Sequence, residues 1–274
     1  MPARRTDVRI DGARTRRDAT AAQRTAYLVT CEHGGNAIPA PYAALFRGHG
    51  RLLASHRGYD AGALVMGRAL ARALCARLLT STVSRLLVEL NRSPGRQFRD
   101  SPVMRRASRA VRAEVCRRYY TPHWNEAEDF VTRAVAAGNR VVHISSHSFT
   151  PALDGAERAA DVGLLYDPGR SRERALCTLW QAALRARAPS WITRRNYPYR
   201  GTGDGLTRYL RTRFDDAAYC GIELEINQKH VRGGSAIAAH ERAAIVAALR
   251  DALAATDARN LRQRAPRGRG SAFP

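Results

Sequence analysis

Lysine is almost absent from this 274-residue sequence, and aromatic residues are few. Of the 46 lysine and arginine residues only Lys229 is a lysine, and phenylalanine, tryptophan and tyrosine make up 7% of the chain. A basic chain with so few aromatic residues lacks the interleaved pattern of single-stranded nucleic-acid binders. Arginine in place of lysine is typical of a GC-rich genome, so we attribute part of the net charge of +22 to codon usage. The remainder favours an anionic substrate.

Cysteine is scarce and dispersed. The five cysteines, Cys31, Cys75, Cys116, Cys177 and Cys220, form no C-x-x-C pair. This spacing excludes a cysteine-ligated zinc site and favours reduced thiols in a cytosolic protein.

Long apolar runs are also missing. No stretch approaches the roughly 18 apolar residues that a membrane helix needs. The N-terminus, MPARRTDVRIDGARTRRD, lacks the apolar segment of a secretory signal. We therefore predict a cytoplasmic protein without a membrane partner.

Both ends of the chain are strongly basic. Residues 1–24 hold seven arginines and three aspartates, and residues 256–274 hold five arginines and one aspartate, so each end carries a net charge of +4. We predict a poorly ordered N-terminal arm (1–24), one catalytic domain (25–255) and a basic C-terminal tail (256–274). Nucleic-acid binding by the arms is a disfavoured alternative, because no recognised binding motif supports it. The oligomeric state stays open.

Between these ends, short apolar runs alternate with helical patterns. The predicted strands are 26–31, 81–90, 140–145, 162–167 and 220–226, and the predicted helices are 61–79, 104–118 and those starting at Ser171 and His240. The alternation predicts a single-domain α/β fold, a three-layer sandwich with a mixed, mostly parallel central sheet.

Polar side chains follow four of the predicted strands. They are His33, then Glu89 with Asn91 and Arg92, then His147, and finally Glu223 and Glu225. In open α/β sheets ligands bind beyond the carboxyl ends of the strands. His33 and His147 with one carboxylate would make an ordinary catalytic zinc set that leaves one position for water. Another glutamate could then transfer protons, and Arg92 with Asn91 could grip a carboxylate.

Each of these residues also has an ordinary structural interpretation. His143 lies within a strand and is better explained as a packed, hydrogen-bonded residue than as a ligand. Glu223 and Glu225, which alternate onto one face of their strand, could form salt bridges with the abundant arginines. Arg92 could be one more surface arginine.

A series of motifs resembles one known family. CEHGGNAIP, YDAGA, SRLLVELNRSP, YYTPHW, SSHSFTP, VGLLYD, NYPYRGTGDGLTRYL and ELEINQ occur in the order seen in the N-formylglutamate amidohydrolase family, from about Tyr27 to Val231. The resemblance, which extends to zinc carboxypeptidases and succinylglutamate desuccinylases, implies a phosphorylase/hydrolase-like fold and one zinc ion per chain. It further implies hydrolysis of an N-acyl amide on an acidic amino acid, and a role in histidine degradation.

The resemblance also implies roles for individual residues. His33 resembles the first zinc ligand and His147 the last. Asn91 and Arg92 are similar to the pair that holds the substrate's α-carboxylate. Glu89 matches the acid that supports the first histidine, and Glu225 resembles the general base, with Glu223 ranked lower. Arg85 could stabilise an oxyanion or make a second carboxylate contact.

One position departs from the carboxypeptidase pattern. The glutamate ligand three residues after the first histidine is replaced by Asn36, a poor zinc ligand. Asp60 in HRGYDAGA is our first choice for the missing carboxylate, because amidohydrolase relatives have an aspartate there. Glu32 is the second choice.

The stretch NYPYRGTGDGLTRYL predicts a glycine-rich turn followed by a helix from Thr207. Asn196, Tyr199 and Arg200 could contact the substrate's side chain, or the segment could be only a well-made loop. The favoured function is a zinc-dependent deacylase whose namesake substrate is N-formylglutamate. The alternatives are a related amidohydrolase or peptidase with another acyl or peptide substrate, an arginine-rich nucleic-acid-binding protein, and an enzyme that has lost its metal.

Overall fold

The computed structural model describes residues 24–264, with the side chains of residues 260–264 left out. Residues 1–23 of the predicted N-terminal arm and residues 265–274 of the predicted tail lie outside the described part. Helix α7 (Ala239–Arg264) continues past residue 256. Residues 256–264 are therefore helical, and the predicted boundary at residue 256 does not coincide with the end of a structural element.

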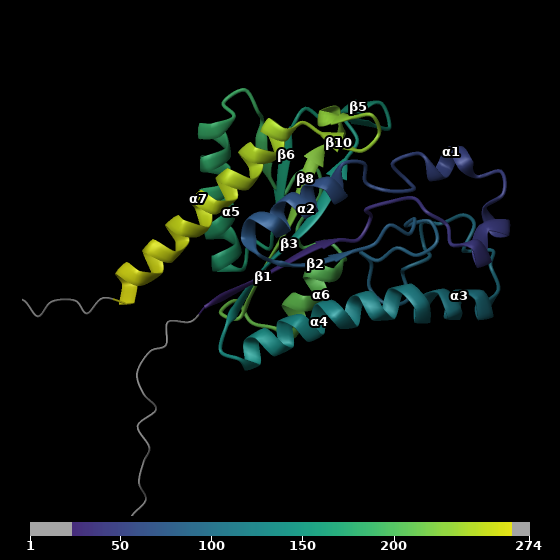
Figure 1. Ribbon diagram of the computed structural model, residues 1–274, viewed down its shortest axis with the longest axis horizontal. Coiled ribbons are helices and arrows are strands. Elements are labelled where there is room, and N and C mark those ends of the chain that lie inside the picture. The colour runs from purple at the N-terminus through teal and green to yellow at the C-terminus, as the bar shows by residue number, and fades with distance from the viewer. Residues whose placement is uncertain (1–23, 265–274) are drawn as a thin grey trace, which may run out of the picture.

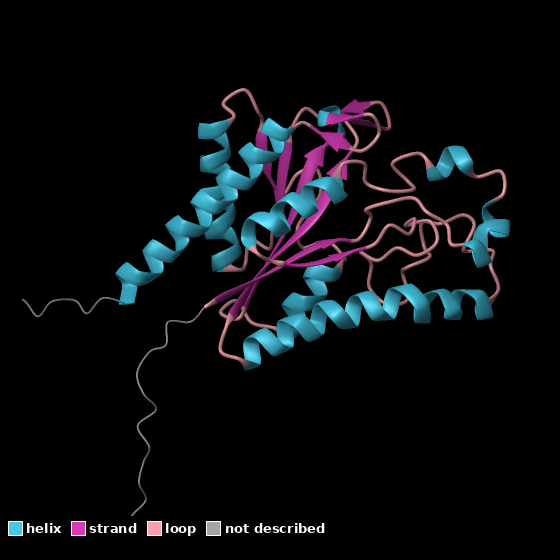
Figure 2. Ribbon diagram, in the orientation of Figure 1, coloured by secondary structure: helices cyan, strands magenta, loops and turns pink. Residues whose placement is uncertain are grey.

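A six-stranded sheet forms the centre of the molecule (Figures 1 and 2). Its strands are β1 (Thr25–Cys31), β2 (Arg77–Thr80), β3 (Arg140–Phe149), β6 (Val162–Leu165), β7 (Thr193–Arg195) and β8 (Tyr219–Asn227), in the order β2-β1-β3-β8-β6-β7. The first four in this order are parallel, whereas β6 pairs antiparallel with β8 and parallel with β7. The sheet is therefore mixed and mostly parallel, as predicted.

Helices cover both faces of the sheet (Figure 1). Helices α2 (Ala63–Leu74), α5 (Ser171–Arg187) and α7 pack on one face, and α4 (Thr121–Ala136) and α6 (Leu206–Arg213) pack on the other. Shorter helices α1 (Gly50–Leu53) and α3 (Arg109–Val115), a 3-10 turn at Ala40–Phe46 and a π turn at Cys116–Tyr120 complete the second layer. The small hairpins β4/β5 (Ala152–Leu153, Ala156–Glu157) and β9/β10 (Val231–Arg232, Ala236–Ile237) lie outside the main sheet. This is the predicted three-layer sandwich.

Each face of the sheet has its own hydrophobic core. The first contains Met66, Leu70, Trp180, Ile245 and Leu249, and the second contains Leu87, Trp124, Val131, Leu206 and Leu210. Strand β3 is buried along its whole length apart from Arg140, because helices cover both faces of the sheet, and its histidines and serines are therefore interior residues.

The predicted strand at 81–90 is wrong. The strand at this edge is β2 (Arg77–Thr80), and the predicted helix 61–79 wrongly included most of it. Residues 81–90 form turns, because the Ser84 hydroxyl accepts a hydrogen bond from Leu86 N and donates one to Gly58 O. The apolar run is still buried, with Leu87 fully inaccessible, so burial without strand pairing produced the misleading pattern.

Two helix predictions need new boundaries. Helix α2 ends at Cys75, which adopts a left-handed conformation at φ 50°. The predicted helix 104–118 begins only at Arg109, because the Ser108 hydroxyl caps it by accepting a hydrogen bond from Val111 N. The chain then continues through the π turn into α4, a helix that the sequence analysis did not identify.

Among the described residues, no helix combines the length and apolar character that crossing a membrane requires. Most side chains of the predicted site lie at the carboxyl ends of β1, β3 and β8 and on the irregular segment 81–108. This segment links β2 to α3 and carries Arg85, Glu89, Asn91 and Arg92.

Candidate metal and catalytic site

The two predicted histidine ligands come from neighbouring strands. His33 follows the end of β1, and its carbonyl accepts a hydrogen bond from Asp60 N at 2.9 Å. His147 lies near the end of β3, where the preceding residue, Ser146, points to the opposite face and donates to Ala63 O at 2.9 Å. The period-two alternation of β3 therefore turns His147 toward His33.

Asp60 completes a compact group with the two histidines. Its Oδ2 lies 3.2 Å from His33 Nδ1 and 2.9 Å from His147 Nδ1. All three side chains are buried, and one ligand atom from each lies within 4.8 Å of the others. Two imidazoles and one carboxylate in this arrangement fit the donor set of a catalytic zinc site.

The outer nitrogen of each histidine is held by acidic or hydroxyl groups. His33 Nε2 donates to Glu89, and His147 Nε2 donates to Ser145 Oγ at 2.8 Å, which in turn donates to Glu32 at 2.8 Å. With Nε2 as the donor in these contacts, Nδ1 of each ring is the atom that faces Asp60 and would be available to a metal. Such outer contacts fix the tautomer that a metal ligand needs.

Negative charge dominates around these rings. Burial opposes ionisation of both carboxyls, but His33, His147 and Arg85 outweigh it at Asp60 and hold its pKa well below the usual range. Arg85 and His33 do the same for the pKa of Glu89. Burial also lowers the pKa of His147, yet its contacts with Asp60 and Glu32 raise it well above the ordinary value. An environment that stabilises a proton here would equally stabilise a metal cation.

Arg85 connects two of the carboxylates. Its Nε and Nη2 contact Glu89 at 2.8 and 2.6 Å, and its Nη1 donates to Asp60 at 3.0 Å. Although all three nitrogens are engaged, the side chain is 24% exposed and borders the cavity. The structure therefore places Arg85 behind the ligands, and its predicted oxyanion contact stays a prediction.

Asn91 and Arg92 lie beside the histidines. Asn91 Oδ1 accepts a hydrogen bond from Leu206 N at 2.8 Å, which fixes the side chain at the start of α6. Arg92 Nη1 donates to the carbonyls of Asn91 and Asp204 at 2.9 and 3.2 Å. These carbonyls orient the guanidinium without neutralising its charge, so Arg92 stays able to pair with an anion.

A cavity of about 410 Å³ contains most of the predicted groups. His33, Asp60, Arg85, Asn91, Arg92, His147, Tyr199, Arg200, Glu223 and Glu225 all line it. The structure thus brings together residues that are spread over nearly 200 positions of the sequence.

Glu225 is the buried acid of this cavity. Its side chain is 5% exposed, and Oε2 has no hydrogen-bond partner among the described residues. Burial, with smaller contributions from Asp60 and Glu223, raises its pKa to about 8 against the opposing effects of His147 and Arg85. Glu223 instead accepts a hydrogen bond from Thr207 at 2.6 Å. Of the two glutamates, Glu225 is the one free to exchange a proton.

Asn196 departs from its predicted place. Its Oδ1 accepts hydrogen bonds from Tyr166 N and Gly201 N, and the residue does not line the cavity. Tyr199 and Arg200 do line it and are exposed. The structure therefore favours the loop interpretation for Asn196, and contact with the substrate stays a prediction for Tyr199 and Arg200.

The remaining ligand alternatives are separated by geometry. Asn36 is exposed and donates to Leu53 O at 3.2 Å, away from the histidines. Glu32 is fully buried behind His147, and it reaches only the outer nitrogen of that ring, at 3.2 Å. Asp60, our first choice, is the carboxylate that faces both inner nitrogens.

Several residues at the site were not identified from the sequence. Arg96 and Arg99 line the cavity, as does Asp204, which accepts a hydrogen bond from Ser93. His123 lies 3.9 Å from Glu32. The only signal for the arginines was their place on the SPGRQFR loop directly after Arg92. His143 matches the expectation of a packed residue, since it is bonded to Thr30 and Tyr219 at 2.8 and 2.7 Å.

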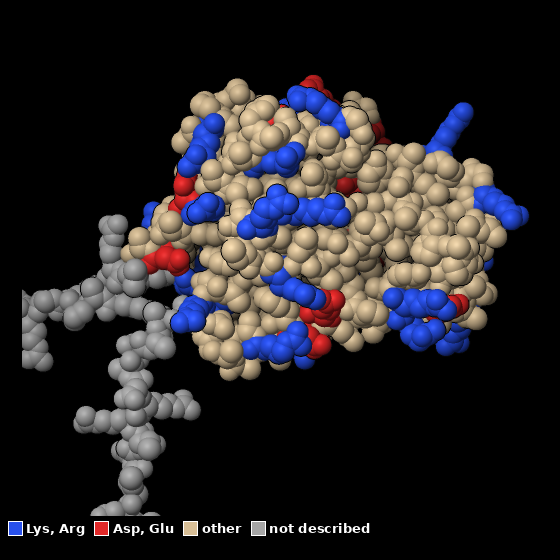
Figure 3. Space-filling view, in the orientation of Figure 1, with Lys and Arg blue, Asp and Glu red and all other residues tan. Residues whose placement is uncertain are grey.

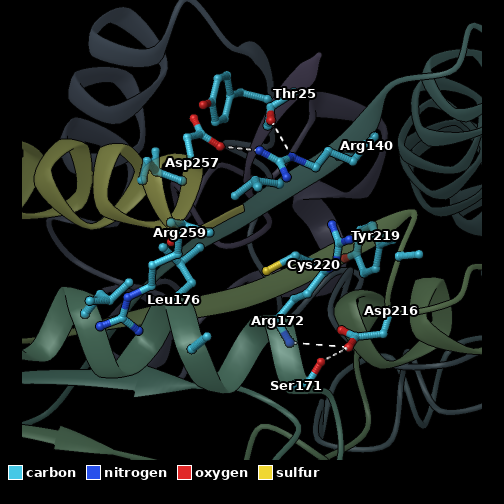
Figure 4. A pocket seen from close by; sticks show the side chains of 18 residues that line it. Thr25, Arg140, Ser171, Arg172, Leu176, Asp216, Tyr219, Cys220, Asp257 and Arg259 are labelled. Atoms are coloured by element: carbon cyan, nitrogen blue, oxygen red, sulfur yellow. Dashed lines mark hydrogen bonds and ion pairs between the residues drawn. The ribbon is translucent and has the colours of Figure 1, made fainter. Parts of the chain in front are cut away.

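A separate cavity of about 360 Å³ lies at the amino-terminal ends of β1, β3 and β8 (Figure 4). Several of its polar groups have partners. Arg140 contacts Thr25 and Asp257, and Ser171 donates to Asp216 at 2.7 Å. No histidine and none of the predicted site residues lines this cavity, so we assign no chemistry to it.

Comparison with known proteins identifies the family. The sequence profile of N-formylglutamate amidohydrolases matches residues 25–231, about three quarters of the chain. The chain belongs to the N-formylglutamate amidohydrolase family. It is therefore a hydrolase of the amidohydrolase type, as the motif series indicated. No curated protein matches the chain at a significant level.

Two solved structures share the fold. The Agrobacterium tumefaciens gene product Atu2144 is 28% identical over 84% of this chain and 91% of its own, with a TM-score of 0.69. An N-formylglutamate amidohydrolase from Ralstonia eutropha JMP134 is 18% identical over 87% of this chain and 96% of its own, with a TM-score of 0.65. The match covers almost the full length of each of these two structures, which confirms the predicted fold class.

Proposed function

We propose that this amidohydrolase is zinc-dependent and hydrolyses the amide of an N-acyl acidic amino acid of the N-formylglutamate type. The observation that supports this proposal most directly is that one cavity holds all the required groups. His33, Asp60 and His147 line it together with Glu225, whose Oε2 has no partner among the described residues, and Arg92, which can pair with an anion. The favoured location is the cytoplasm.

The three ligand residues would hold one zinc ion. When bound, the ion would polarise the amide carbonyl and lower the pKa of a water molecule toward ~7. Glu89, and Ser145 with Glu32, keep the outer nitrogens protonated, so that both histidines present a lone pair inward. Arg85 acts as a positioning residue because it holds Asp60 and Glu89 in place.

Glu225 would take a proton from the attacking water and pass it to the leaving amine. Its buried Oε2, which has no partner among the described residues, and its position beside His147 in the strand register suit a group that exchanges a proton at the metal site.

Arg92 would hold the α-carboxylate of the substrate. The two carbonyls that orient its guanidinium leave further N–H groups for a charge-assisted contact. Arg96, Arg99 and Arg200 add positive charge to the same cavity, which favours an acidic amino acid over a neutral one.

Surface charge provides no specific support for a nucleic-acid-binding role. On the face seen in Figure 3, arginines are scattered between uncharged residues and form no continuous stripe. The basic segments 1–23 and 265–274 lie outside the described residues, so binding by the arms stays a prediction.

Release of glutamate from N-formylglutamate by the full-length, zinc-supplied protein tests the proposal. We expect turnover that a chelator abolishes and that added zinc restores. A zinc-loaded protein that releases no glutamate would contradict the proposed activity. Arg200→Leu and Tyr199→Phe can then measure the contributions of the exposed cavity residues to KM.

A further inference from the structure

A second cavity meets the first at the candidate metal site. It measures about 380 Å³ and shares Asp60, Arg85, Ser148 and Tyr199 with the 410 Å³ cavity that contains Arg92 and Glu225. The shared residues include a candidate metal ligand, so a substrate bound at the metal could extend into both spaces. Arg92 lines only the first cavity, which leaves the second for the part of the substrate on the other side of the scissile amide.

The two cavities differ in chemistry. The first carries the arginines that would bind carboxylates. The second has an apolar floor made by Leu86, Phe149 and Leu153, of which Leu86 and Phe149 are each 2% exposed. Two of its charged groups, Arg85 and Glu89, bind each other, and Arg57 Nη2 donates to the backbone carbonyl of Asp100 at 3.2 Å.

A formyl group would not use this space. Formyl has one carbon and one oxygen, both of which would lie at the metal, so the second cavity would hold only water.

We propose that the second cavity is an acyl-chain subsite, and that the preferred substrate is an acidic amino acid carrying an uncharged acyl group of about four to six carbons. This inference rests on the proposed amidohydrolase function. The chain of the acyl group lies on Leu86, Phe149 and Leu153, while the α-carboxylate lies at Arg92 on the far side of the metal site.

The reaction stays an ordinary amide hydrolysis. The carbon–nitrogen bond of the amide breaks, and a carbon–oxygen bond to the attacking water forms. One proton of the water passes through Glu225 to the leaving nitrogen, and the products are the free carboxylic acid of the acyl chain and the amino acid. No other reactant is required.

A substrate series tests the subsite. The zinc-supplied full chain is given N-formyl-, N-acetyl-, N-butanoyl- and N-hexanoyl-glutamate, and kcat/KM is measured for each. Burial of each added CH₂ is worth up to about fourfold, and we expect the hexanoyl compound to exceed the formyl compound by at least about tenfold, since the subsite is partly open. A formyl compound that is the best of the series would overturn the proposal and leave the amidohydrolase function intact.

A binding measurement separates the subsite from catalysis. Dissociation constants of the same four compounds are determined by calorimetry on Glu225→Gln, which should bind but not turn over. Affinity that increases with chain length supports the subsite even if the wild type is inactive, whereas equal affinities contradict it. If all four compounds bind but wild type cleaves none, the proposed function fails and the subsite stands.

Filling the cavity gives the sharpest test. Leu153 is half-buried on a short hairpin, so Leu153→Trp should fold and occupy the subsite. It should lower the hexanoyl-to-formyl ratio of kcat/KM by about tenfold, as expected if most of the buried chain is displaced. Leu45→Trp, at an exposed position outside both cavities, is the control and should leave the ratio unchanged. An unchanged ratio in Leu153→Trp would contradict the subsite, and faster cleavage of Leu-Glu than of N-hexanoylglutamate would replace it with a peptide-binding site.

Discussion

The two ends of the central sheet carry charged residues in different ways. At the amino-terminal ends, Arg140 and Asp257 pair with each other across a cavity whose floor is apolar. At the carboxyl ends, Glu225 is buried without a partner, and Asp60 faces two histidines at once. Arg140 and Asp257 at the first end pair with each other, whereas Glu225 Oε2 at the second has no hydrogen-bond partner among the described residues. Cavity size alone, which is similar at the two ends, does not distinguish a functional site from a packing defect.

The largest effect should come from Glu225. In Glu225→Gln the group can no longer accept a proton, and general-base catalysis is worth about 10²–10⁴-fold. We expect kcat for the preferred N-acylglutamate to decrease by about 10³-fold, with zinc content unchanged because Glu225 is not a ligand. A loss of zinc together with activity would instead make Glu225 part of the metal site.

The next largest effect should come from Arg92 at the carboxyl ends, with Arg140 at the amino-terminal ends as its comparison. Arg92→Leu removes the proposed carboxylate anchor, and loss of a buried charge-assisted contact costs about 2–5 kcal/mol. We expect kcat/KM to decrease by about 100-fold, mostly through KM. Arg140→Leu breaks an ion pair at the amino-terminal end and should lower the free energy of unfolding by about 1 kcal/mol without changing KM. Equal effects of the two substitutions on KM would remove the distinction between the ends.

Outer contacts of the histidines should tune zinc affinity. Glu89→Gln weakens the acceptor that holds His33 Nε2, and loss of such a partner typically lowers metal affinity by 10–100-fold. We expect about a 50-fold increase in the zinc dissociation constant, measured by competition with a chelator. The matched control is Glu241→Gln. Glu241 accepts from His230 Nδ1 at 2.8 Å in a cluster outside both site cavities, and its substitution should not change zinc affinity.

The smallest effect concerns pH and stability. Burial, together with Arg211, His123 and His147, lowers the pKa of His143 to about 4, although Glu32 opposes the shift. The unfolded chain, with a pKa near ~6.5, therefore takes up the proton first as the pH falls. The stability that neutral His143 contributes is complete above pH ~6.5 and is lost toward pH 4.

Between pH 7 and pH 5 this loss should be about 2 kcal/mol. It can be measured as the difference in urea-unfolding free energy between the wild type and His143→Gln, both with zinc bound. The pH dependence of the two proteins should diverge below pH ~6.5. Parallel curves would show that His143 does not titrate as its buried position implies.

The ends of the strands could be predicted from the sequence because apolar runs followed by polar residues mark them. His33, His147 and Glu225 each lie at such a point, and the structure brings them into one cavity. Asp60 was proposed by resemblance to relatives, because it lies on a loop whose position only the fold determines. Its backbone N–H is bonded to His33 O, a contact that no local pattern encodes.

Other features could not be predicted, for physical reasons that differ. The segment 81–90 is as apolar as a buried strand, but its Ser84 hydroxyl bonds to the backbone and turns the chain. The resemblance suggested a substrate contact for Asn196, with a well-made loop as the alternative, and its side chain accepts hydrogen bonds from Tyr166 N and Gly201 N. In both places the side chain bonds to the backbone of one nearby and one distant residue, and composition does not reveal which partner a polar group takes.

The central claim is that His33, Asp60 and His147 hold a zinc ion. The most direct test is zinc content by mass spectrometry in the wild type, His33→Ala, His147→Ala and His230→Ala, each purified after zinc is supplied. His230 is the control because it is also a buried, carboxylate-bonded histidine but lies outside the site. The account predicts about one zinc per chain in the wild type and His230→Ala, and none in the other two variants. A wild-type protein without zinc, or site variants that retain it, would contradict the account.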